Sequence, residues 1–219
     1  MCNLYSMTRN QDAIRRLFNI VKDDAGNMPL LPGIFPNYRA PVVRGGADGR
    51  ELAMMYWGMP NPPQIPGYST NIRNTGSPHW RRWLKPESRC LVPVTSFSEY
   101  APEANPATGK KDIVWFALSD ERPLFAFAGI WTEWTGRRGP AKAPMVDGPH
   151  LAYAFLTTVP NGVVEPIHPK AMPVIVHQDD WETWLTAEPK EALRLQRPWP
   201  DDQLQIVARG PAKEDAAPA

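Results

Sequence analysis

Short runs of apolar residues, many of them alternating with polar ones, recur along this chain of 219 residues. Such runs, bounded by Gly, Pro, Asn, Asp or Ser, are typical of β-strands. Residues 40–59 fit two strands joined by a glycine-rich turn. We expect further strands at 89–100, 112–118, 124–134, 151–160, 172–177 and 203–208.

Apolar residues recur at helical spacing in only a few segments. The apolar residues of 9–22 predict an amphipathic helix, and Thr8 with Gln11 three residues later predicts a capping box at its start. A short helix or turn is expected at 78–86, and another short helix behind Asp179 as its N-cap. Many short strands with few helices indicate an α+β fold, mainly antiparallel, with a barrel-like core.

The prolines shape the rest of the chain. There are 26 of them, which argues against long helices and predicts an extended loop over 28–41. Pro93 lies within an expected strand and suggests an edge or a bulge there. We expect a single domain over residues 1–209, and a flexible C-terminal tail over 210–219, where the composition turns polar and small.

The net charge and the cysteine content exclude several classes of protein and of binding site. A net charge of +1 excludes a strongly basic, histone-like binder and leaves room for a local basic patch. Cys2 and Cys90 form neither a metal set nor a disulfide framework, so we expect no metal and no organic cofactor. With no signal pattern, no apolar run of about 18 residues and no heptads, we expect a cytoplasmic monomer without a membrane partner.

Cys2 is the most distinctive chemical group. A lone cysteine is most simply structural or incidental. If Met1 is removed, however, Cys2 carries a free α-amine and a thiol on adjacent carbons. An α-amine has a pKa of about 7.7–8, so part of it is neutral at pH 7 and can attack an aldehyde, and the thiol can then close a thiazolidine ring within the same residue.

Two further groups could move protons. Glu99 ends a mostly apolar strand beside Phe97 and Tyr100, where burial would raise the pKa of its carboxyl group, although it could equally face water. His168 lies in a turn before a strand and is either a proton carrier or a surface histidine.

The densest basic stretch runs from residue 71 to 89 and contains tryptophans at 80 and 83. Base stacking combined with phosphate pairing would suit a single strand of nucleic acid, whereas a solvated basic face with inward tryptophans is the competing interpretation. Asn71 could hydrogen-bond a substrate and Arg73 could contact a phosphate.

Taken in order, these residues resemble the SRAP (SOS-response-associated peptidase) family, whose members crosslink to abasic sites in single-stranded DNA. The resemblance spans residues 1 to about 185. Its landmarks are Met1-Cys2, Ala40-Pro41, Trp57-Gly58, the NIR of 71–73, the RCLVP of 89–93, Phe97, Glu99, the H…MPVIV from His168, and a DDWETWL helix.

The resemblance implies a mixed domain with a barrel-like core and a positively charged cleft. It implies that Cys2 forms a thiazolidine with the ring-opened deoxyribose, and that Asn71 positions the N-terminal residue and the sugar. It also implies that Glu99 transfers protons and acts in removing Met1, and that His168 helps to open the sugar ring and to reverse the crosslink. It further implies that Arg73 holds a phosphate. Together with the basic stretch described above, the expected DNA-binding residues are Arg73, Arg81, Arg82, Lys85 and Trp57.

The chain departs from the family pattern mainly where DNA would be gripped. Members usually begin Cys-Gly-Arg, whereas this chain has Asn3 and Leu4 and so lacks the phosphate contact of that arginine. Further departures are the order Asn37-Tyr38, the loop residues Pro62, Pro63 and Gln64, the pair Thr95-Ser96, and Lys170. The residues of the proposed chemistry are all present.

Three functions remain open at this point. The first is an abasic-site sensor that binds single-stranded DNA and crosslinks to it through Cys2 during the DNA damage response. The second is an N-terminal-nucleophile peptidase or hydrolase that uses the same Cys2. The third is a non-catalytic nucleic-acid-binding module in which Cys2 is incidental.

Overall fold

A five-stranded barrel forms the centre of the computed structural model, which describes residues 2–140 and 144–215. Neighbouring strands pair antiparallel in the order β13, β12, β9, β4, β5, and a parallel pairing of β5 with β13 closes the ring. The strands are β4 (Arg39–Gly46), β5 (Gly49–Trp57), β9 (Arg89–Val94), β12 (Phe125–Arg138) and β13 (Val146–Thr158). The expected α+β class, mainly antiparallel with a barrel-like core, is thus confirmed.

Short strands extend the barrel at its margins. β2 pairs with β5, β8 and β14 with β13, β15 with β12, and β6 with β7. Their bounds are β2 (Ile20–Asp23), β6 (Met59–Pro60), β7 (Tyr68–Ser69), β8 (Asn71–Ile72), β14 (Met172–Pro173) and β15 (Ile175–Val176).

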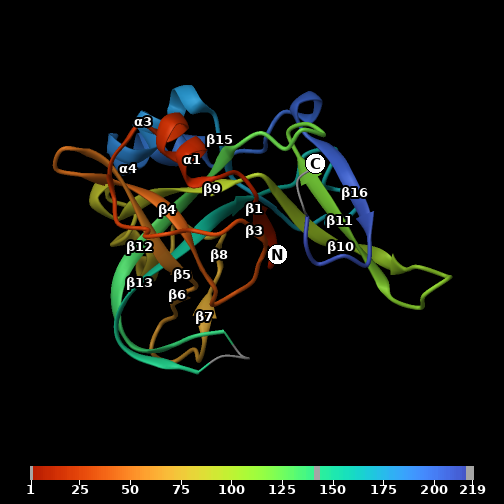
Figure 1. Ribbon diagram of the computed structural model, residues 1–219, viewed down its shortest axis with the longest axis horizontal. Helices are drawn as coiled ribbons and strands as arrows, with labels where there is room; N and C mark the ends of the chain where they lie inside the picture. The colour runs from red at the N-terminus through yellow and green to blue at the C-terminus, as the bar shows by residue number, and fades with distance from the viewer. Residues whose placement is uncertain (1, 141–143, 216–219) are drawn as a thin grey trace.

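A second antiparallel sheet lies beside the barrel, on the right in Figure 1, with the order β16, β11, β10, β1, β3. Its strands are β1 (Tyr5–Met7), β3 (Leu31–Ile34), β10 (Ser96–Ala104), β11 (Lys111–Ala117) and β16 (Gln205–Gly210). Aromatic rings join it to the barrel: Phe97 of β10 meets Phe127 of β12 at 5.7 Å between ring centroids. Tyr5 of β1 packs edge-on against Trp57, Phe127 and Phe155 of the barrel.

Helices cover one end of the barrel, at the upper left in Figure 1. Phe18 of α1 stacks on Trp181 of α3 at 4.3 Å between centroids, and the Trp184 indole donates to the carbonyl of Cys90 in β9. The helical segments are α1 (Gln11–Phe18), α2 (Pro78–Arg81), η1 (Pro86–Ser88), η2 (Gln178–Asp180), α3 (Trp181–Thr186), α4 (Pro189–Ala192), η3 (Leu193–Leu195) and η4 (Asp201–Gln203).

Both predicted helix caps are wrong. Helix α1 is capped by Asn10, whose side chain accepts from the amide of Ala13, while the Gln11 side chain instead donates to Asp23. The helix also ends earlier than predicted, because Asn19 adopts a left-handed conformation (φ 52°) and turns the chain into β2. In the later segment the N-cap of α3 is Asp180, and it makes no side-chain cap bond.

Several strand predictions also needed correction. The stretch 89–100 is two strands, β9 in the barrel and β10 in the second sheet, and 172–177 is likewise divided into β14 and β15. The expected loop over 28–41 contains β3 and the start of β4. β9 is an interior strand, but its pairing with β4 is confined to Cys90 and Leu91, so Pro93 lies where one side of the ladder has ended.

Residues 211–215, assigned to the flexible tail from sequence, are held against the second sheet. The indole of Trp115 donates to the carbonyl of Ala212, and the amide of Asp215 donates to the carbonyl of Pro32. Asp215 is buried, so the composition of this segment misled the prediction. Residues 216–219 lie outside the described residues, and no described helix is long and apolar enough to cross a membrane.

Candidate active site

Strand β1 determines where Cys2 lies. Tyr5 is paired with Phe97 of β10 on one side and with Ile34 of β3 on the other, and its hydroxyl shares a hydrogen bond with that of Tyr153 inside the barrel. Beyond this strand, the amide of Ser98 donates to the carbonyl of Leu4 at 3.0 Å. The chain is therefore fixed on both sides at Tyr5 and on the β10 side at Leu4, which places Cys2 at the junction of the barrel and the second sheet.

Asn71 reaches the same point from the barrel. Strand β8 pairs in parallel with β13, with Asn71 opposite Phe155. The Asn71 Nδ2 donates to the carbonyl of Cys2 at 2.8 Å and to Thr70 Oγ1 at 2.8 Å. Its Oδ1 is buried and accepts no hydrogen bond from the described residues. Asn71 thus anchors the backbone of residue 2 and leaves one acceptor at the site.

Glu99 comes from β10, and the residue is only 7% exposed. Burial disfavours the charged form and raises the pKa of this carboxyl group to about 7. Near neutral pH the group is therefore present in both protonation states and suits both proton uptake and release. The sequence-based expectation of a buried carboxyl with a raised pKa describes this environment better than a residue facing water.

The Cys2 thiol is also buried, and it donates to the carbonyl of Leu4 at 3.4 Å. Burial, and secondarily the negative charge of Glu99, raise the pKa of Cys2 well above its ordinary value. The sulfur is therefore held as a neutral thiol, which needs a proton acceptor before it can act as a nucleophile. Glu99 is near enough to act on it electrostatically.

A cavity of about 620 Å³ opens beside these residues. Its walls combine the acid Glu99, the cation Lys213, hydroxyl and amide groups, and the rings of two tyrosines and a phenylalanine. The lining residues are Asn3, Leu4, Phe35, Pro36, Tyr68, Thr70, Ser98, Glu99, Tyr100 and Lys213. Flat aromatic groups around a few polar ones suit a ligand with apolar faces and polar edges.

His168 lies in the turn between β13 and β14, and its ring is partly exposed. Burial, together with the Lys170 ammonium group, lowers the pKa of His168. Strands β8 and β14 pair with adjacent stretches of β13, and Arg73 Nη1 donates to the carbonyl of Lys170 at 3.4 Å. The structure therefore brings the His168 turn against the segment that carries Asn71.

The basic segment around α2 fits in part the interpretation of a solvated basic face with tryptophans that point inward. Trp83 is buried and Trp80 partly buried, while Arg81, Arg82 and Lys85 are exposed. The guanidinium of Arg82 lies over the Trp83 ring at 3.8 Å. The tryptophans thus turn inward, and the three cations remain accessible to a polyanion.

Trp57 is the one proposed DNA-binding residue that the structure rules out for stacking. Its side chain is completely buried, it stacks on Phe155 at 5.2 Å, and its indole donates to the carbonyl of Thr70. No ring face is left for a base, so the prediction is corrected: Trp57 supports the Thr70–Asn71 segment from within the core.

Sequence analysis missed several residues of the cavity. Tyr68 and Thr70 line the cavity and lie within three residues of Asn71 in the sequence. Their proximity to a proposed site residue was therefore an available signal. Phe35 and Lys213 gave no such signal, because β3 and the C-terminal segment reach the cavity only through the pairing of the second sheet.

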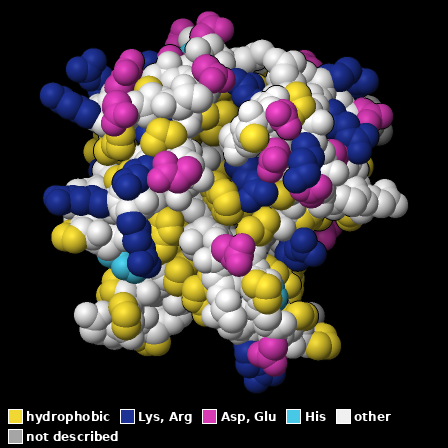
Figure 2. All heavy atoms as spheres, turned by 90° about the vertical axis from the view of Figure 1, so that its left-hand side faces the viewer, with side chains coloured by type: hydrophobic (Ala, Val, Ile, Leu, Met, Phe, Trp, Pro, Cys, Tyr) yellow, Lys and Arg dark blue, Asp and Glu magenta, His cyan; other side chains and the backbone are white. Residues whose placement is uncertain are grey.

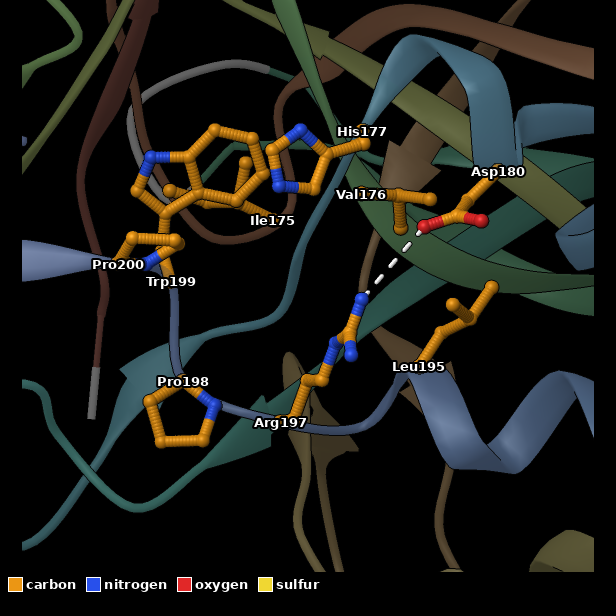
Figure 3. A pocket seen from close by; sticks show the side chains of 9 residues that line it. All are labelled: Ile175, Val176, His177, Asp180, Leu195, Arg197, Pro198, Trp199 and Pro200. Atoms are coloured by element: carbon orange, nitrogen blue, oxygen red, sulfur yellow. Dashed lines mark ion pairs between the residues drawn. The ribbon is translucent and has the colours of Figure 1, made fainter. Parts of the chain in front are cut away.

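The face of the molecule shown in Figure 2 carries charges of both signs. On the face shown in Figure 2, Lys and Arg side chains are interspersed with Asp and Glu, and hydrophobic side chains lie between them. Figure 3 shows another cavity, of about 260 Å³, in which Arg197 pairs with Asp180 at 3.8 Å and His177 stacks on Trp199. Among the described residues, no three His, Cys, Asp or Glu side chains cluster in a way that could hold a metal ion.

Comparison with known proteins places this architecture in a family. The family model described as SOS response associated peptidase (SRAP) matches residues 1–209. The abasic site processing protein YoqW of Bacillus subtilis (strain 168) is 26% identical over 216 residues, covering 94% of this chain and 90% of that protein. The abasic site processing protein YoaM of the same organism is 30% identical over 151 residues, covering 66% of this chain and 60% of that protein.

A solved structure agrees with the fold. A crystal structure of a protein from Bordetella bronchiseptica matches with a TM-score of 0.72 at 22% identity, covering 96% of this chain and 99% of that one. The barrel and the second sheet therefore belong to a shared architecture, and the chain is a member of the SRAP family.

Proposed function

We propose that this protein processes abasic sites, binding single-stranded DNA and forming a covalent thiazolidine crosslink through Cys2 after removal of Met1. Two curated relatives are named abasic site processing proteins. Met1 lies outside the described residues, so its removal is part of the proposal. The crosslink would shield the abasic site from strand scission during the DNA damage response.

The chemistry follows from the two nucleophiles of one residue. The neutral α-amine of Cys2 adds to the aldehyde carbon of the ring-opened deoxyribose, and loss of water gives an imine. The thiol then adds to the imine carbon, its proton passes to the nitrogen, and a five-membered ring closes. No oxidant or reductant is needed, and the ring closure is intramolecular, which strongly favours it over attack by an external thiol.

Glu99 has the properties that these proton transfers require. Protonated, it can donate to the hydroxyl group that leaves as water; ionised, it can accept the proton of the buried Cys2 thiol. Its pKa of about 7 makes both forms available at neutral pH. In this proposal His168, on the turn adjoining the Asn71 segment, assists opening of the sugar ring and reversal of the crosslink.

The observation that carries the proposal is the hydrogen bond from Asn71 Nδ2 to the carbonyl of Cys2. It holds the backbone of residue 2 beside the buried Glu99 and a cavity of sufficient size for a sugar and an adjoining base. A residue whose only role was packing would not need its carbonyl fixed by a side chain from another sheet. Fixing a reacting residue against a cavity is the usual way to gain proximity.

The decisive experiment is a denaturing gel of the protein incubated with single-stranded DNA that contains one abasic site. We expect a slowly migrating covalent band that requires the abasic site and is lost in Cys2→Ala. Cys90→Ala is the matched control, since Cys90 is the other buried cysteine and lies in the barrel wall. Cys2→Ser should give no stable adduct, yet borohydride should trap its imine, because the amine remains.

Other outcomes would identify the competing functions. Amide or peptide hydrolysis that depends on Cys2, with no covalent DNA band, would favour an N-terminal-nucleophile peptidase. Salt-sensitive DNA binding unaffected by Cys2→Ala, with neither activity, would favour a binding module. An intact mass that retains Met1 in active protein would contradict the thiazolidine mechanism, because the amine of Cys2 would be blocked.

A further inference from the structure

The C-terminal segment crosses the whole second sheet after its last strand. We call residues 211–215 the C-terminal strap. It contacts β11, β10 and β1: the Trp115 indole donates to the carbonyl of Ala212, the Ser96 hydroxyl to the Asp215 carboxylate, and the Ser6 hydroxyl to the Asp215 carbonyl. The Asp215 amide donates to the carbonyl of Pro32 in β3. The strap thus passes from one edge of the sheet to the other.

A buried ion pair fastens the end of the strap. The Arg122 guanidinium binds the Asp215 carboxylate with both a 3.0 Å bond from Nε to Oδ2 and a 3.0 Å bond from Nη2 to Oδ1. The side chains are 9% and 5% exposed. A charge pair this deep is tolerated only when both partners are present, so loss of either one would release the strap.

Gly33 of β3 lets the strap approach closely. A Cβ at this position would lie 2.7 Å from the backbone carbonyl oxygen of Lys213 and 3.3 Å from Glu214. A contact of 2.7 Å with a backbone atom cannot be relieved by a side-chain rotation. Glycine at position 33 therefore determines that the strap lies flat on β3.

This course brings Lys213 to the wall of the cavity beside Cys2. Among the described residues that line the cavity, Lys213 is the one cation and Glu99 the one acid. Leu4 and Asn3, next to Cys2 in the sequence, line the same cavity without contributing a charge. The positive charge of this cavity thus comes from a segment more than 200 residues away along the chain.

We propose that the C-terminal strap supplies Lys213 as a phosphate ligand, which holds the DNA backbone at the cavity next to Cys2. The inference rests on the proposed function, since it takes DNA as the ligand. A nucleotide placed in the cavity brings its own phosphate with it, and an ammonium group on a long stem suits such a point charge. The strap lies beyond residues 1–209, the part matched by the family model.

Lys213→Gln tests the assignment directly in a Cys2→Ala background, where binding is free of crosslinking. We expect the logarithmic salt slope of affinity for single-stranded DNA to fall in magnitude by about 0.7, the contribution of one phosphate contact on a single strand. Lys213→Arg should keep the slope. Lys110→Gln, an exposed lysine on the β10–β11 hairpin, is the matched control and should leave it unchanged.

Strap variants test whether the position of Lys213 matters. Gly33→Ala displaces the strap, and its slope should match that of Lys213→Gln. The double variant should show no further decrease, because both changes remove the same contact. Thermal melting and circular dichroism confirm that Gly33→Ala is folded; if it is not, Lys213→Gln and Lys213→Arg still decide the question.

The outcomes separate the inference from the proposed function. If wild-type protein crosslinks abasic DNA while Lys213→Gln keeps the full salt slope, the assignment of Lys213 is overturned and the function stands. If wild-type protein binds single strands with a slope that depends on Lys213 but never crosslinks, the strap inference stands and the covalent mechanism fails. Absence of any DNA binding overturns both.

Discussion

The cavity beside Cys2 and the cavity of Figure 3 differ in how their walls are assembled. The second is built from a single stretch, residues 175–200, and its charged side chains pair with each other, Asp180 with Arg197. The first draws on segments between residues 3 and 213, joined by the second sheet and the edge of the barrel. Convergence of distant segments on a buried acid is what distinguishes a chemical site from a local gap in packing.

The two cavities also differ in what holds them in place. Beside Cys2, a hydrogen bond between residues 69 positions apart fixes the backbone, and a buried ion pair fastens the strap. In the Figure 3 cavity, the ring of His177 rests on Trp199 and the ion pair is largely exposed to solvent. Substitutions at the cavity beside Cys2 should therefore affect the crosslinking reaction, and substitutions at the cavity of Figure 3 should affect folding stability at most.

Glu99→Gln should have the largest effect on rate. The substitution keeps the shape of the side chain and removes proton transfer, so crosslinking at pH 7 should slow by about 100-fold, the lower range for a positioned acid or base. Wild-type rates should change with a midpoint near pH 7, following the pKa of Glu99, and the variant should lose this dependence. Glu103→Gln, on the exposed end of β10, is the control. Equal rates in Glu99→Gln and wild type would remove Glu99 from the mechanism.

The same variant predicts a stability difference whose sign is fixed by the pKa shift. Because burial raises the pKa of Glu99 from 4.5 to about 7, the folded state holds its proton longer than the unfolded state. Wild-type protein therefore loses stability from this group as pH rises between these values, and Glu99→Gln does not. The free energy of unfolding of Glu99→Gln should therefore increase relative to that of wild type as pH rises, by up to about 3 kcal/mol above pH 7. Denaturant unfolding at pH 5 and pH 8 measures this; a gain confined to pH 5 would contradict it.

Asn71→Ala should have the next largest effect on the crosslinking rate. It removes the hydrogen bond that fixes the Cys2 carbonyl, and a bond of this kind contributes about 1–1.5 kcal/mol, so crosslinking should slow by about tenfold. Single-turnover gels at saturating DNA measure the rate. His177→Ala in the Figure 3 cavity serves as the comparison and should leave it unchanged. A slower rate in His177→Ala than in Asn71→Ala would reverse the ranking of the two cavities.

The fold could be predicted where local pattern decides structure. Alternation of apolar and polar residues located most strands, and their number indicated an antiparallel α+β fold. The parallel closure of β5 on β13 could not be seen, because it joins residues about 100 positions apart. The separation of β9 from β10 could not be seen either, because a single residue, Thr95, connects two strands that pair in different sheets. The cap of α1 was wrong because two polar residues compete for it, and Asn10 rather than Thr8 has the required geometry.

The site was predictable only in part, for the same reason. Cys2, Asn71 and Glu99 could be named because amine–thiol chemistry and a family resemblance point to them. Trp57 was assigned to DNA on the family resemblance, and the sequence alone could not show that its side chain lies in the core. Lys213 lay in a segment whose composition suggests disorder, and its position depends on Gly33, Arg122 and Asp215.

Arg73→Ala should have a smaller effect, on binding rather than on chemistry. Arg73 is exposed on the segment that carries Asn71, and its guanidinium contacts the Lys170 carbonyl, so its charge faces the rim of the site. In a Cys2→Ala background the salt slope for single-stranded DNA should fall in magnitude by about 0.7. Arg16→Ala on α1 is the control, as an exposed arginine on the helical end of the molecule. An unchanged slope would show that Arg73 binds no phosphate.

Arg197→Gln should have the smallest effect of all and tests the Figure 3 cavity itself. The Arg197–Asp180 pair is 3.8 Å long, with side chains 63% and 33% exposed, so water screens most of its attraction. Exposed pairs of this kind contribute about 0–1 kcal/mol, and the free energy of unfolding should fall within the lower half of that range. Denaturant melts measure it, alongside a crosslinking gel on which the variant should match wild type. A variant with an unchanged melt but reduced crosslinking would mean that this cavity takes part in DNA binding, because no structural loss could then account for the lost activity.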